Sequence, residues 1–270
     1  MPAASLTDRN ANLSRLKAGV KPPHCPVDPA RASRAGYAAA RMPLSHATNC
    51  GVFEKILGGR ELLSQVRSAS PPGAAETLLE TADDGFFYVA AFTYPNTECG
   101  FLFQATLEND FMASGVATPF DSGALAHKVP PPAPYADALT FVRHHELPVP
   151  GYRSLLESII ANDAPSAEAF LIDPVFRCSC GAPRAHPFGL TGADRRGNTF
   201  DVRIPRSVPI ESPHLRAVFV RNGFEPRGLH RFVSAGVGIV RSSADDDADR
   251  KFAALREASI QFILEHFLKS

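Results

Sequence analysis

The sequence predicts an α+β fold, and three observations predict it. The middle of the chain holds short runs in which apolar and polar residues alternate, which is typical of a strand with one buried face. Towards both ends, apolar residues recur at the spacing of an amphipathic helix. Because strands and helices do not alternate regularly along the chain, the pattern favours segregated strands and helices over a doubly wound sheet.

The first half of the chain predicts strands around one well-marked helix. Residues 42–49 indicate a short strand. Asn49 can cap the helix that follows, which carries an apolar face and ends at the glycine pair 58–59. A short helix is expected over residues 74–82. Two strands are then expected, over residues 85–92 and 100–105.

The second half predicts two more strands between two helices. The helices are expected over residues 151–161 and 245–267. In residues 199–204, Phe200, Val202 and Ile204 alternate with Asp201 and Arg203, and Pro205 then ends the strand because proline cannot donate a ladder hydrogen bond. A further strand is expected over 215–220. The acid and the base on the polar side of residues 199–204 have two interpretations, a solvated face with a weak ion pair or the rim of a ligand cleft.

Length and charge set the domain organisation. A chain of 270 residues suits one large domain with a core of its own, which we place at 42–270. Residues 1–41 contain seven Lys or Arg residues and two acids, and they predict a flexible basic arm. Lys+Arg and Asp+Glu are equal at 28 each, so the net charge makes no general case for a nucleic-acid or membrane partner. The sequence has no apolar run of membrane-spanning length and no apolar N-terminal core of a secretory signal.

The cysteines predict reduced thiols in a cytoplasmic protein. There are five, and an odd number without a secretory signal argues against a disulfide framework. Cys178 and Cys180, followed by His186, are an alternative zinc site. Their spacing is shorter than the usual C-x₂-C and a second ligand pair is missing, so we predict that no metal is bound.

Three segments contain candidate catalytic or ligand-binding residues. The sequence lacks the phosphate loop, the nucleophile elbow and the metal-binding H-E-x-x-H motif. His46 ends a short strand before a helix in LSHATNCGVFEKILGG (44–59). An aromatic strand follows in DGFFYVAAF (84–92). Asp201 protrudes from the late strand in TFDVRIPRSVPIESPHLRAVFV (199–220). This order of segments resembles the ADP-ribosyltransferase superfamily, and most closely the DarT-like nucleic-acid ADP-ribosyltransferases.

The resemblance implies a fold and a reaction. The fold would be ADP-ribosyltransferase-like, with split mixed sheets and flanking helices. The reaction would transfer ADP-ribose from NAD, which is a substrate, to a nucleic-acid or protein acceptor, in a toxin or defence role. The arginine-rich stretch 177–206 favours a nucleic acid. The alternative is a non-catalytic binding or scaffold protein that keeps the fold.

The resemblance also implies which residues hold NAD. His46 would contact a ribose hydroxyl or the phosphate side of NAD, with Thr48 beside it on the same strand. The ring of Phe86, Phe87 or Tyr88 would stack on nicotinamide. Arg203 would grip a phosphate. The alternatives are a capping histidine and a core packing role for the aromatic strand.

The catalytic carboxylate implied by the resemblance is Asp201, which would stabilise the positive charge on ribose and deprotonate the acceptor. The family has glutamate where this chain has the shorter Asp201. Either the backbone compensates, or Glu211 takes the role, or the protein is inactive. Asp121 and Ser122, in a turn-forming Asp-Ser-Gly, are candidate contacts for the cofactor or the acceptor.

Overall fold

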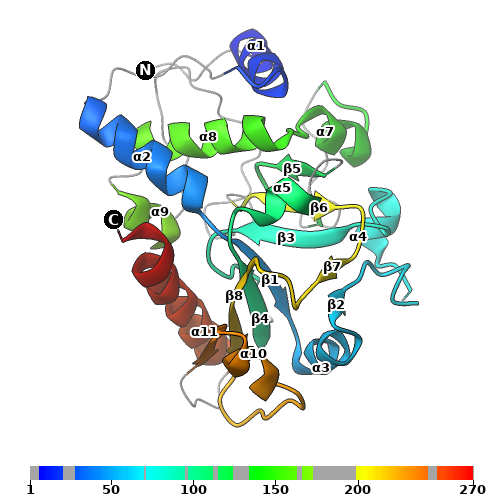
Figure 1. The fold of residues 1–270 in the computed structure, drawn as a ribbon. Helices are drawn as coiled ribbons and strands as arrows, with labels where there is room; N and C mark the ends of the chain where they lie inside the picture. Colours follow the sequence, from blue (N-terminus) through cyan, green and yellow to red (C-terminus); the bar gives the residue numbers. More distant parts are fainter. Residues whose placement is uncertain are drawn as a thin grey trace. The chain divides into compact units, whose positions relative to one another are not determined.

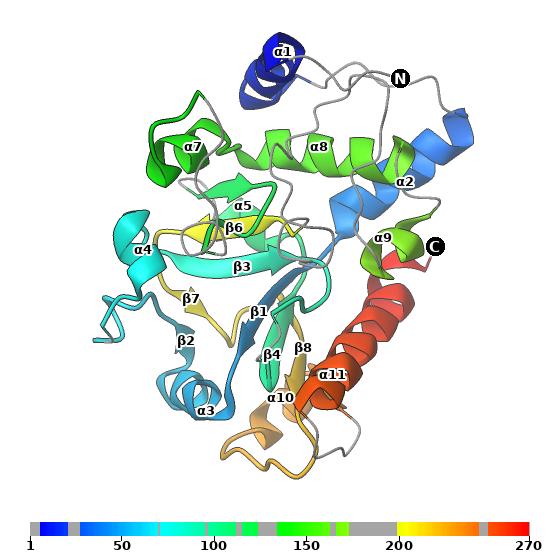
Figure 2. The same ribbon diagram turned by 180° about the vertical axis from the view of Figure 1, so that it is seen from behind.

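The computed structural model describes residues 6–20, 28–69, 71–94, 97–111, 115–123, 134–162, 166–172, 199–242 and 248–269 (Figures 1 and 2). The chain divides into two compact units. The first comprises Met1–Arg41, Pro71–Ala82 and Gly115–Arg203, and the second comprises Met42–Ser70, Asp83–Ser114 and Ile204–Ser270. Each unit is built from segments that are far apart in the sequence.

The first unit is mainly helical. Its helices are α1 (Leu6–Lys17), α2 (Pro29–Arg41), α4 (Ala74–Leu78), α7 (Ala138–His144), α8 (Val149–Asn162) and α9 (Ala167–Ile172). Strand β5 (Val116–Thr118) pairs antiparallel with β6 (Asp201–Ile204), so that Thr118 lies opposite Asp201. Helix α7 begins at Asp137, whose side chain accepts a hydrogen bond of 2.7 Å from the Thr140 N–H. This cap satisfies one of the free N–H groups at the start of the helix.

Helices α2 and α8 lie side by side in both views of the ribbon (Figures 1 and 2). Helix α2 buries Ala35, Ala38 and Ala39, and small side chains allow two helices to approach closely. Arg153 of α8 donates a hydrogen bond of 2.7 Å to the Ala39 carbonyl. Residues 29–41 of the expected basic arm form a helix whose alanine face packs within the first unit. The flexibility of the arm over residues 1–41 stays a prediction. The extent of a single domain over 42–270 stays a prediction.

The second unit is built on a mixed sheet. Strand β1 (Leu44–Thr48) lies between β3 (Gly85–Val89) and β4 (Cys99–Phe103) and pairs antiparallel with both. Strand β4 pairs antiparallel with β8 (Leu215–Val220), which pairs parallel with β9 (Gly238–Arg241). A separate two-stranded pair joins β2 (Glu61–Leu62) and β7 (Val208–Pro209). The helices of this unit are α3 (Cys50–Gly59), α5 (Leu107–Phe111), α10 (His230–Ser234), α11 (Ala248–Ile263) and the π-helix η2 (Leu264–Leu268).

Helix α3 follows β1 directly, and its ends match the sequence signals. The Asn49 side chain accepts a hydrogen bond of 2.9 Å from the Val52 N–H, so the predicted N-cap is confirmed. Phe53, Ile56 and Leu57 are buried, as their helical spacing predicts. The residue in the left-handed conformation at the C-terminal end is Arg60, with φ of 61°, although glycine is more usual there.

The sheet of the second unit is tightly packed at Gly100 in β4. A Cβ at this position would lie 2.4 Å from the Phe92 ring and 2.8 Å from the His46 carbonyl oxygen, so only glycine fits. The α+β class is confirmed, with a mixed sheet and flanking helices. Among the helices that the structure describes, none combines the length and apolar character needed to cross a bilayer.

Candidate functional site

His46 sits in the middle of the sheet of the second unit. It is the third residue of β1 and lies opposite Phe101 of β4. Its ring centroid is 5.7 Å from that of Phe87 and 6.4 Å from that of Phe101, and the side chain is half-buried. Phe53 of α3 stacks on Phe101 with a centroid distance of 4.8 Å. The imidazole thus lies on an apolar, aromatic face of the sheet.

The hydrogen bonding of His46 decides its tautomer. Nδ1 lies 2.8 Å from the Phe86 carbonyl oxygen. A carbonyl oxygen can only accept, so Nδ1 carries the hydrogen and Nε2 of the neutral ring keeps its lone pair. Burial lowers the pKa of His46, and the bond to Phe86 opposes this in part. The imidazole is therefore neutral at pH 7 and offers Nε2 as a hydrogen-bond acceptor.

The aromatic strand β3 contacts the side chains of β1 through its backbone carbonyls as well as through its rings. Phe86 is half-buried, and its carbonyl oxygen orients His46. The buried Tyr88 ring stacks on Tyr94 with centroids 6.2 Å apart, and the Tyr88 carbonyl accepts a hydrogen bond from the Ser45 hydroxyl. Stacking of Phe86 or Tyr88 on nicotinamide stays a prediction.

Thr48 ends β1, next to a carboxylate that the sequence analysis missed. The Thr48 carbonyl accepts a 3.0 Å hydrogen bond from the Glu98 N–H. The Glu98 carboxylate accepts from the Cys50 N–H at 2.9 Å and from Arg221 at 2.8 Å. Glu98 therefore holds the start of α3 against the end of β1. Its position just before the strand at residues 100–105 was the available sequence signal, but its partners are distant in sequence.

Glu211, the alternative catalytic carboxylate, lies between two arginines. Its carboxylate oxygens are 3.5 Å from Arg60 and 3.4 Å from Arg231, and 43% of its side chain is exposed. Both distances are longer than those of a strong charge-assisted hydrogen bond. The carboxylate is paired with two cations but is not tightly held by either.

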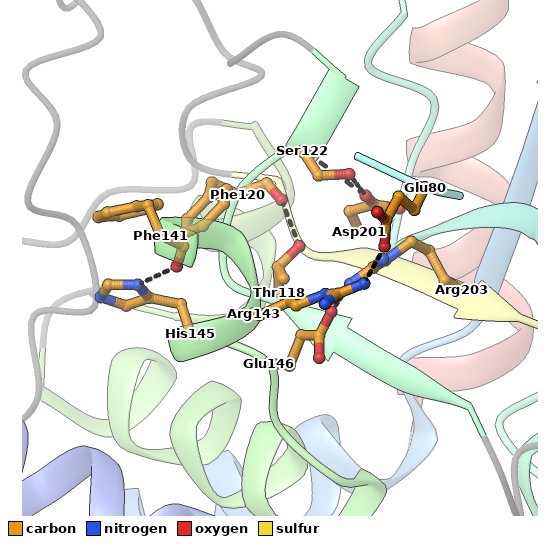
Figure 3. Close-up of polar contacts among 10 residues, drawn as sticks. All are labelled: Glu80, Thr118, Phe120, Ser122, Phe141, Arg143, His145, Glu146, Asp201 and Arg203. Carbon is orange, nitrogen blue, oxygen red and sulfur yellow. Dashed lines mark hydrogen bonds and ion pairs between the residues drawn. The ribbon is translucent and has the colours of Figure 1, made fainter. Parts of the chain in front are cut away.

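Asp201, in the first unit, is completely buried on β6. Its Oδ2 accepts hydrogen bonds from both the N–H and the hydroxyl of Ser122, with 3.3 Å for the N–H (Figure 3). Ser122 is also fully buried and follows β5 by four residues. The Asp-Ser-Gly turn therefore serves to bring a serine onto the carboxylate of the neighbouring strand.

Burial raises the pKa of Asp201 to about 7. The Arg203 charge and the hydrogen bonds from Ser122 act in the opposite direction, while the nearby Asp121 carboxylate adds to the increase. The Oδ1 atom of Asp201 is buried and has no hydrogen-bond partner among the described residues. A carboxyl group in this setting changes its charge close to neutral pH, which suits a proton acceptor.

Arg203 is buried rather than open to a ligand. It lies two residues after Asp201 on β6, and its Nη2 donates a hydrogen bond of 2.6 Å to the Glu146 carboxylate (Figure 3). Its side chain is 5% exposed, and that of Glu146 is 26% exposed. The interpretation of Asp201 and Arg203 as a solvated face is therefore wrong, because both sides of β6 are buried and its charges have partners inside the unit. Arg203 as a phosphate contact stays a prediction.

The predicted residues fall into two groups. The structure brings together Asp121, Ser122, Asp201 and Arg203 in the first unit. The second unit holds His46, Thr48, Phe86, Tyr88 and Glu211, of which His46 and Phe86 share a hydrogen bond. That His46 and Asp201 act on one ligand stays a prediction. The zinc ligands Cys178, Cys180 and His186 lie outside the described residues, and the described part of the chain contains no group of three or more side chains that could hold a metal.

A hydroxyl, an imidazole and a carboxylate form a chain that the sequence analysis did not find. His214 lies 2.8 Å from the Thr106 hydroxyl and 2.6 Å from the Asp110 carboxylate. A nucleophile of this type also needs donors for an oxyanion. The N–H groups of the three residues after Thr106 already donate to carbonyls of the turn. We therefore assign the chain of contacts to anchoring α5, where Asp110 lies.

Comparisons with known proteins show a loose structural likeness but no family. No family model and no curated protein matches the chain. Among solved structures, the chain is similar to DarT from Thermus sp. 2.9 in complex with NAD⁺, at 12% identity and a TM-score of 0.35, over 74% of this chain and 94% of that chain. A likeness this loose carries no argument about the residues or the reaction.

Proposed function

We propose that the chain is an NAD-dependent ADP-ribosyltransferase. The observation that carries the proposal is the half-buried, neutral His46, whose Nδ1 is committed to Phe86 and whose Nε2 lone pair is left to accept a hydrogen bond. The resemblance of three segments to the ADP-ribosyltransferases supplies the reaction. The acceptor is a nucleic acid or a protein.

The tautomer of His46 determines which group of NAD the side chain can bind. A ribose hydroxyl can donate a hydrogen bond to Nε2, whereas the oxygens of an ionised pyrophosphate can only accept. His46 therefore contacts a ribose hydroxyl of NAD and not its phosphates. The hydrogen bond to Phe86 fixes the orientation of the imidazole ring, so Nε2 is oriented before NAD binds.

The reaction breaks the bond between the nicotinamide nitrogen and the ribose carbon. The electron pair leaves with nicotinamide, and positive charge develops on the ribose ring. Asp201 in its ionised form stabilises that charge. The acceptor then attacks the ribose carbon, and its proton passes to the Asp201 carboxylate. Glu211 remains the alternative for this last step.

Paired substitutions of His46 test the NAD contact. In His46→Asn the side-chain amide can still donate to Phe86 but the acceptor at the Nε2 position is lost. In His46→Gln the amide oxygen can reach the Nε2 position. We expect the kcat/KM for nicotinamide release from NAD to fall by about a hundredfold in His46→Asn and less in His46→Gln. His230→Asn, at an exposed histidine, is the control. NAD turnover that survives His46→Asn at the wild-type level would overturn this assignment.

The pH dependence of turnover tests the carboxylate. Because the pKa of Asp201 is raised to about 7, the ionised form increases as the pH rises through that value. We expect turnover to increase over the same range and to be lost in Asp201→Asn. If Asp201→Asn turns over NAD and Glu211→Gln does not, the role belongs to Glu211. Activity in both variants would remove the catalytic assignment.

A second candidate is a protein that keeps the fold and binds a ligand without catalysis. The complete burial of Asp201 and its two hydrogen bonds from Ser122 favour it, because a carboxylate committed in this way also acts as a structural anchor. This candidate would be supported over the enzyme if calorimetry shows that the wild-type protein binds NAD while no nicotinamide is released with any nucleic-acid or protein acceptor tested.

A further inference from the structure

The second unit contains a pocket that the proposed function does not use. Its volume is about 550 Å³. The end of helix α3 lines one part with Leu57, Gly58 and Arg60, and the segment leading into α10 lines another with Arg227, Gly228 and Arg231. The volume falls within the range of small-molecule sites, roughly 300–1,000 Å³. Three of the lining side chains are arginines.

Arg231 is held in place by backbone groups. Its Nη2 donates to the Leu57 carbonyl at 2.7 Å, and its Nε donates to the Gly228 carbonyl at 3.2 Å. Gly228 has a φ of +83°, and a Cβ there would lie 3.2 Å from the Arg231 Nη2. A glycine at this position therefore leaves room for the guanidinium. An arginine fixed before a ligand arrives loses less side-chain entropy on binding it.

Arg60 and Arg231 already bind an anion, which is the chain's own Glu211. The carboxylate of Glu211 lies 3.5 Å from Arg60 and 3.4 Å from Arg231. Strong charge-assisted hydrogen bonds are shorter, about 2.7–2.9 Å. The two arginines thus form an anion-binding site in which the Glu211 carboxylate is only weakly bound.

Arg227 supplies a third positive charge at the pocket. It is exposed and, within the part of the chain that the structure describes, has no ion pair. Glu54 is the acidic residue of the lining. Three guanidinium groups therefore face two carboxylates, those of Glu54 and Glu211. With Glu211 in place, one excess positive charge remains, and a phosphate dianion that replaces the Glu211 carboxylate would neutralise it.

We propose that this pocket is a binding site for a phosphate group. Arg60 and Arg231 bind the phosphate oxygens in place of the Glu211 carboxylate, which is displaced, and Arg227 supplies a third guanidinium contact. Arginine suits this ligand because its planar fork matches two oxygens of a phosphate. The phosphate belongs either to a free nucleotide or to a nucleic-acid backbone. The proposal does not depend on NAD turnover.

Binding of two probes tests the proposal on the full-length chain without NAD. The probes are ADP and a fluorescein-labelled single-stranded DNA of twelve nucleotides, at low salt. We expect Arg227→Ala to weaken binding about tenfold, the loss of one hydrogen bond between charged groups. Glu211→Gln should strengthen binding, because it removes the competing anion. Arg216→Ala, at an exposed arginine of β8 outside the pocket, is the matched control and should bind as the wild type does.

The pattern over the two probes identifies the source of the phosphate. Weakening of both probes by Arg227→Ala assigns the site to the phosphate group itself. Binding of the DNA alone, with a salt dependence that is reduced in Arg227→Ala, assigns it to a nucleic-acid backbone. Binding of ADP alone assigns it to a free nucleotide. Failure of both probes to bind, or equal affinities of Arg227→Ala and Arg216→Ala, overturns the proposal.

Discussion

His46 of β1 and Asp201 of β6 are both polar residues within strands, yet their surroundings give them different chemistry. His46 is half-buried and uses one ring nitrogen for a backbone carbonyl, which leaves the other nitrogen as an acceptor. Asp201 is completely buried, and Ser122 occupies one of its carboxylate oxygens. Burial favours the neutral form of both groups, and it does so in opposite pKa directions. The same physical cause therefore produces a hydrogen-bond acceptor in one unit and a proton-holding acid in the other.

The two groups make opposite contributions to the pH dependence of stability. The folded pKa of Asp201 is raised, so the folded state binds more protons than the unfolded state between about pH 4 and pH 7, and stability falls as the pH rises through this range. The folded pKa of His46 is lowered, so its contribution is present above the unfolded pKa and is lost as the pH falls below it. Each contribution can be removed by one substitution.

The largest effect is expected for Asp201→Asn. The wild type should lose stability relative to this variant as the pH rises from 4 to 8, by roughly 4 kcal/mol in all, because only the wild type must bury a charge. Urea unfolding at a series of pH values measures the difference. Asp137→Asn is the control, since the pKa of that exposed N-cap carboxylate is lowered and its pH effect has the opposite sign. Parallel stability curves for the wild type and Asp201→Asn would show that Asp201 is not held in a neutral form.

The next effect concerns the charge beside Asp201. Arg203→Met leaves Glu146 without its partner and should destabilise the protein by about 3 kcal/mol, as expected for a largely buried pair. It should also raise the pKa of Asp201 further, because Arg203 lowers it. Arg143→Met breaks the exposed Arg143–Glu80 pair in the same unit and should cost less than about 1 kcal/mol. Equal costs for the two variants, measured by urea unfolding, would contradict the contrast between buried and exposed charges.

A smaller effect on stability is expected at His46. His46→Ala leaves the Phe86 carbonyl without its donor and should cost about 1–2 kcal/mol, whereas His46→Asn can keep the bond. The difference in stability between the wild type and His46→Ala should shrink as the pH falls below the pKa of an unfolded histidine, because only the wild-type imidazole is penalised for taking up a proton. Thermal unfolding at pH 5 and pH 8 measures both quantities. A loss in His46→Asn as large as in His46→Ala would mean that the bond to Phe86 is not what stabilises the strand.

The smallest effect is expected on the rate at which two cysteine thiols are alkylated. Burial also raises the pKa of the Cys50 and Cys99 thiols, whose sulfur atoms lie 3.6 Å apart at the junction of β1, β4 and α3. Since the thiolate is the reactive form, both should be alkylated more slowly at pH 8 than free glutathione. Iodoacetamide labelling followed by mass spectrometry tests this. Fast labelling of Cys99 in the native protein would show that this end of strand β4 opens readily.

Local signals in the sequence were sufficient for the elements around His46. The Asn49 cap, the buried face of α3 and the strands at 44–48 and 85–89 follow from side-chain spacing and from one hydrogen bond within a turn. These features depend on residues a few positions apart, so the sequence determines them before the chain is folded. Helix α2 was missed because residues 1–41 were interpreted from their charge alone, although Ala35, Ala38 and Ala39 recur at helical spacing.

The chemistry of the polar residues was decided only by the tertiary structure. Alternation over residues 199–204 shows that Asp201 and Arg203 share a side of the strand, but it does not show whether that side is covered. Their partners, Ser122 and Glu146, come from segments 79 and 57 residues away, and the acceptor that fixes the His46 tautomer comes from 40 residues away. Desolvation and these long-range hydrogen bonds set the pKa values and the free lone pair. They depend on which surfaces meet in the folded chain, and residue spacing along the sequence carries no record of that.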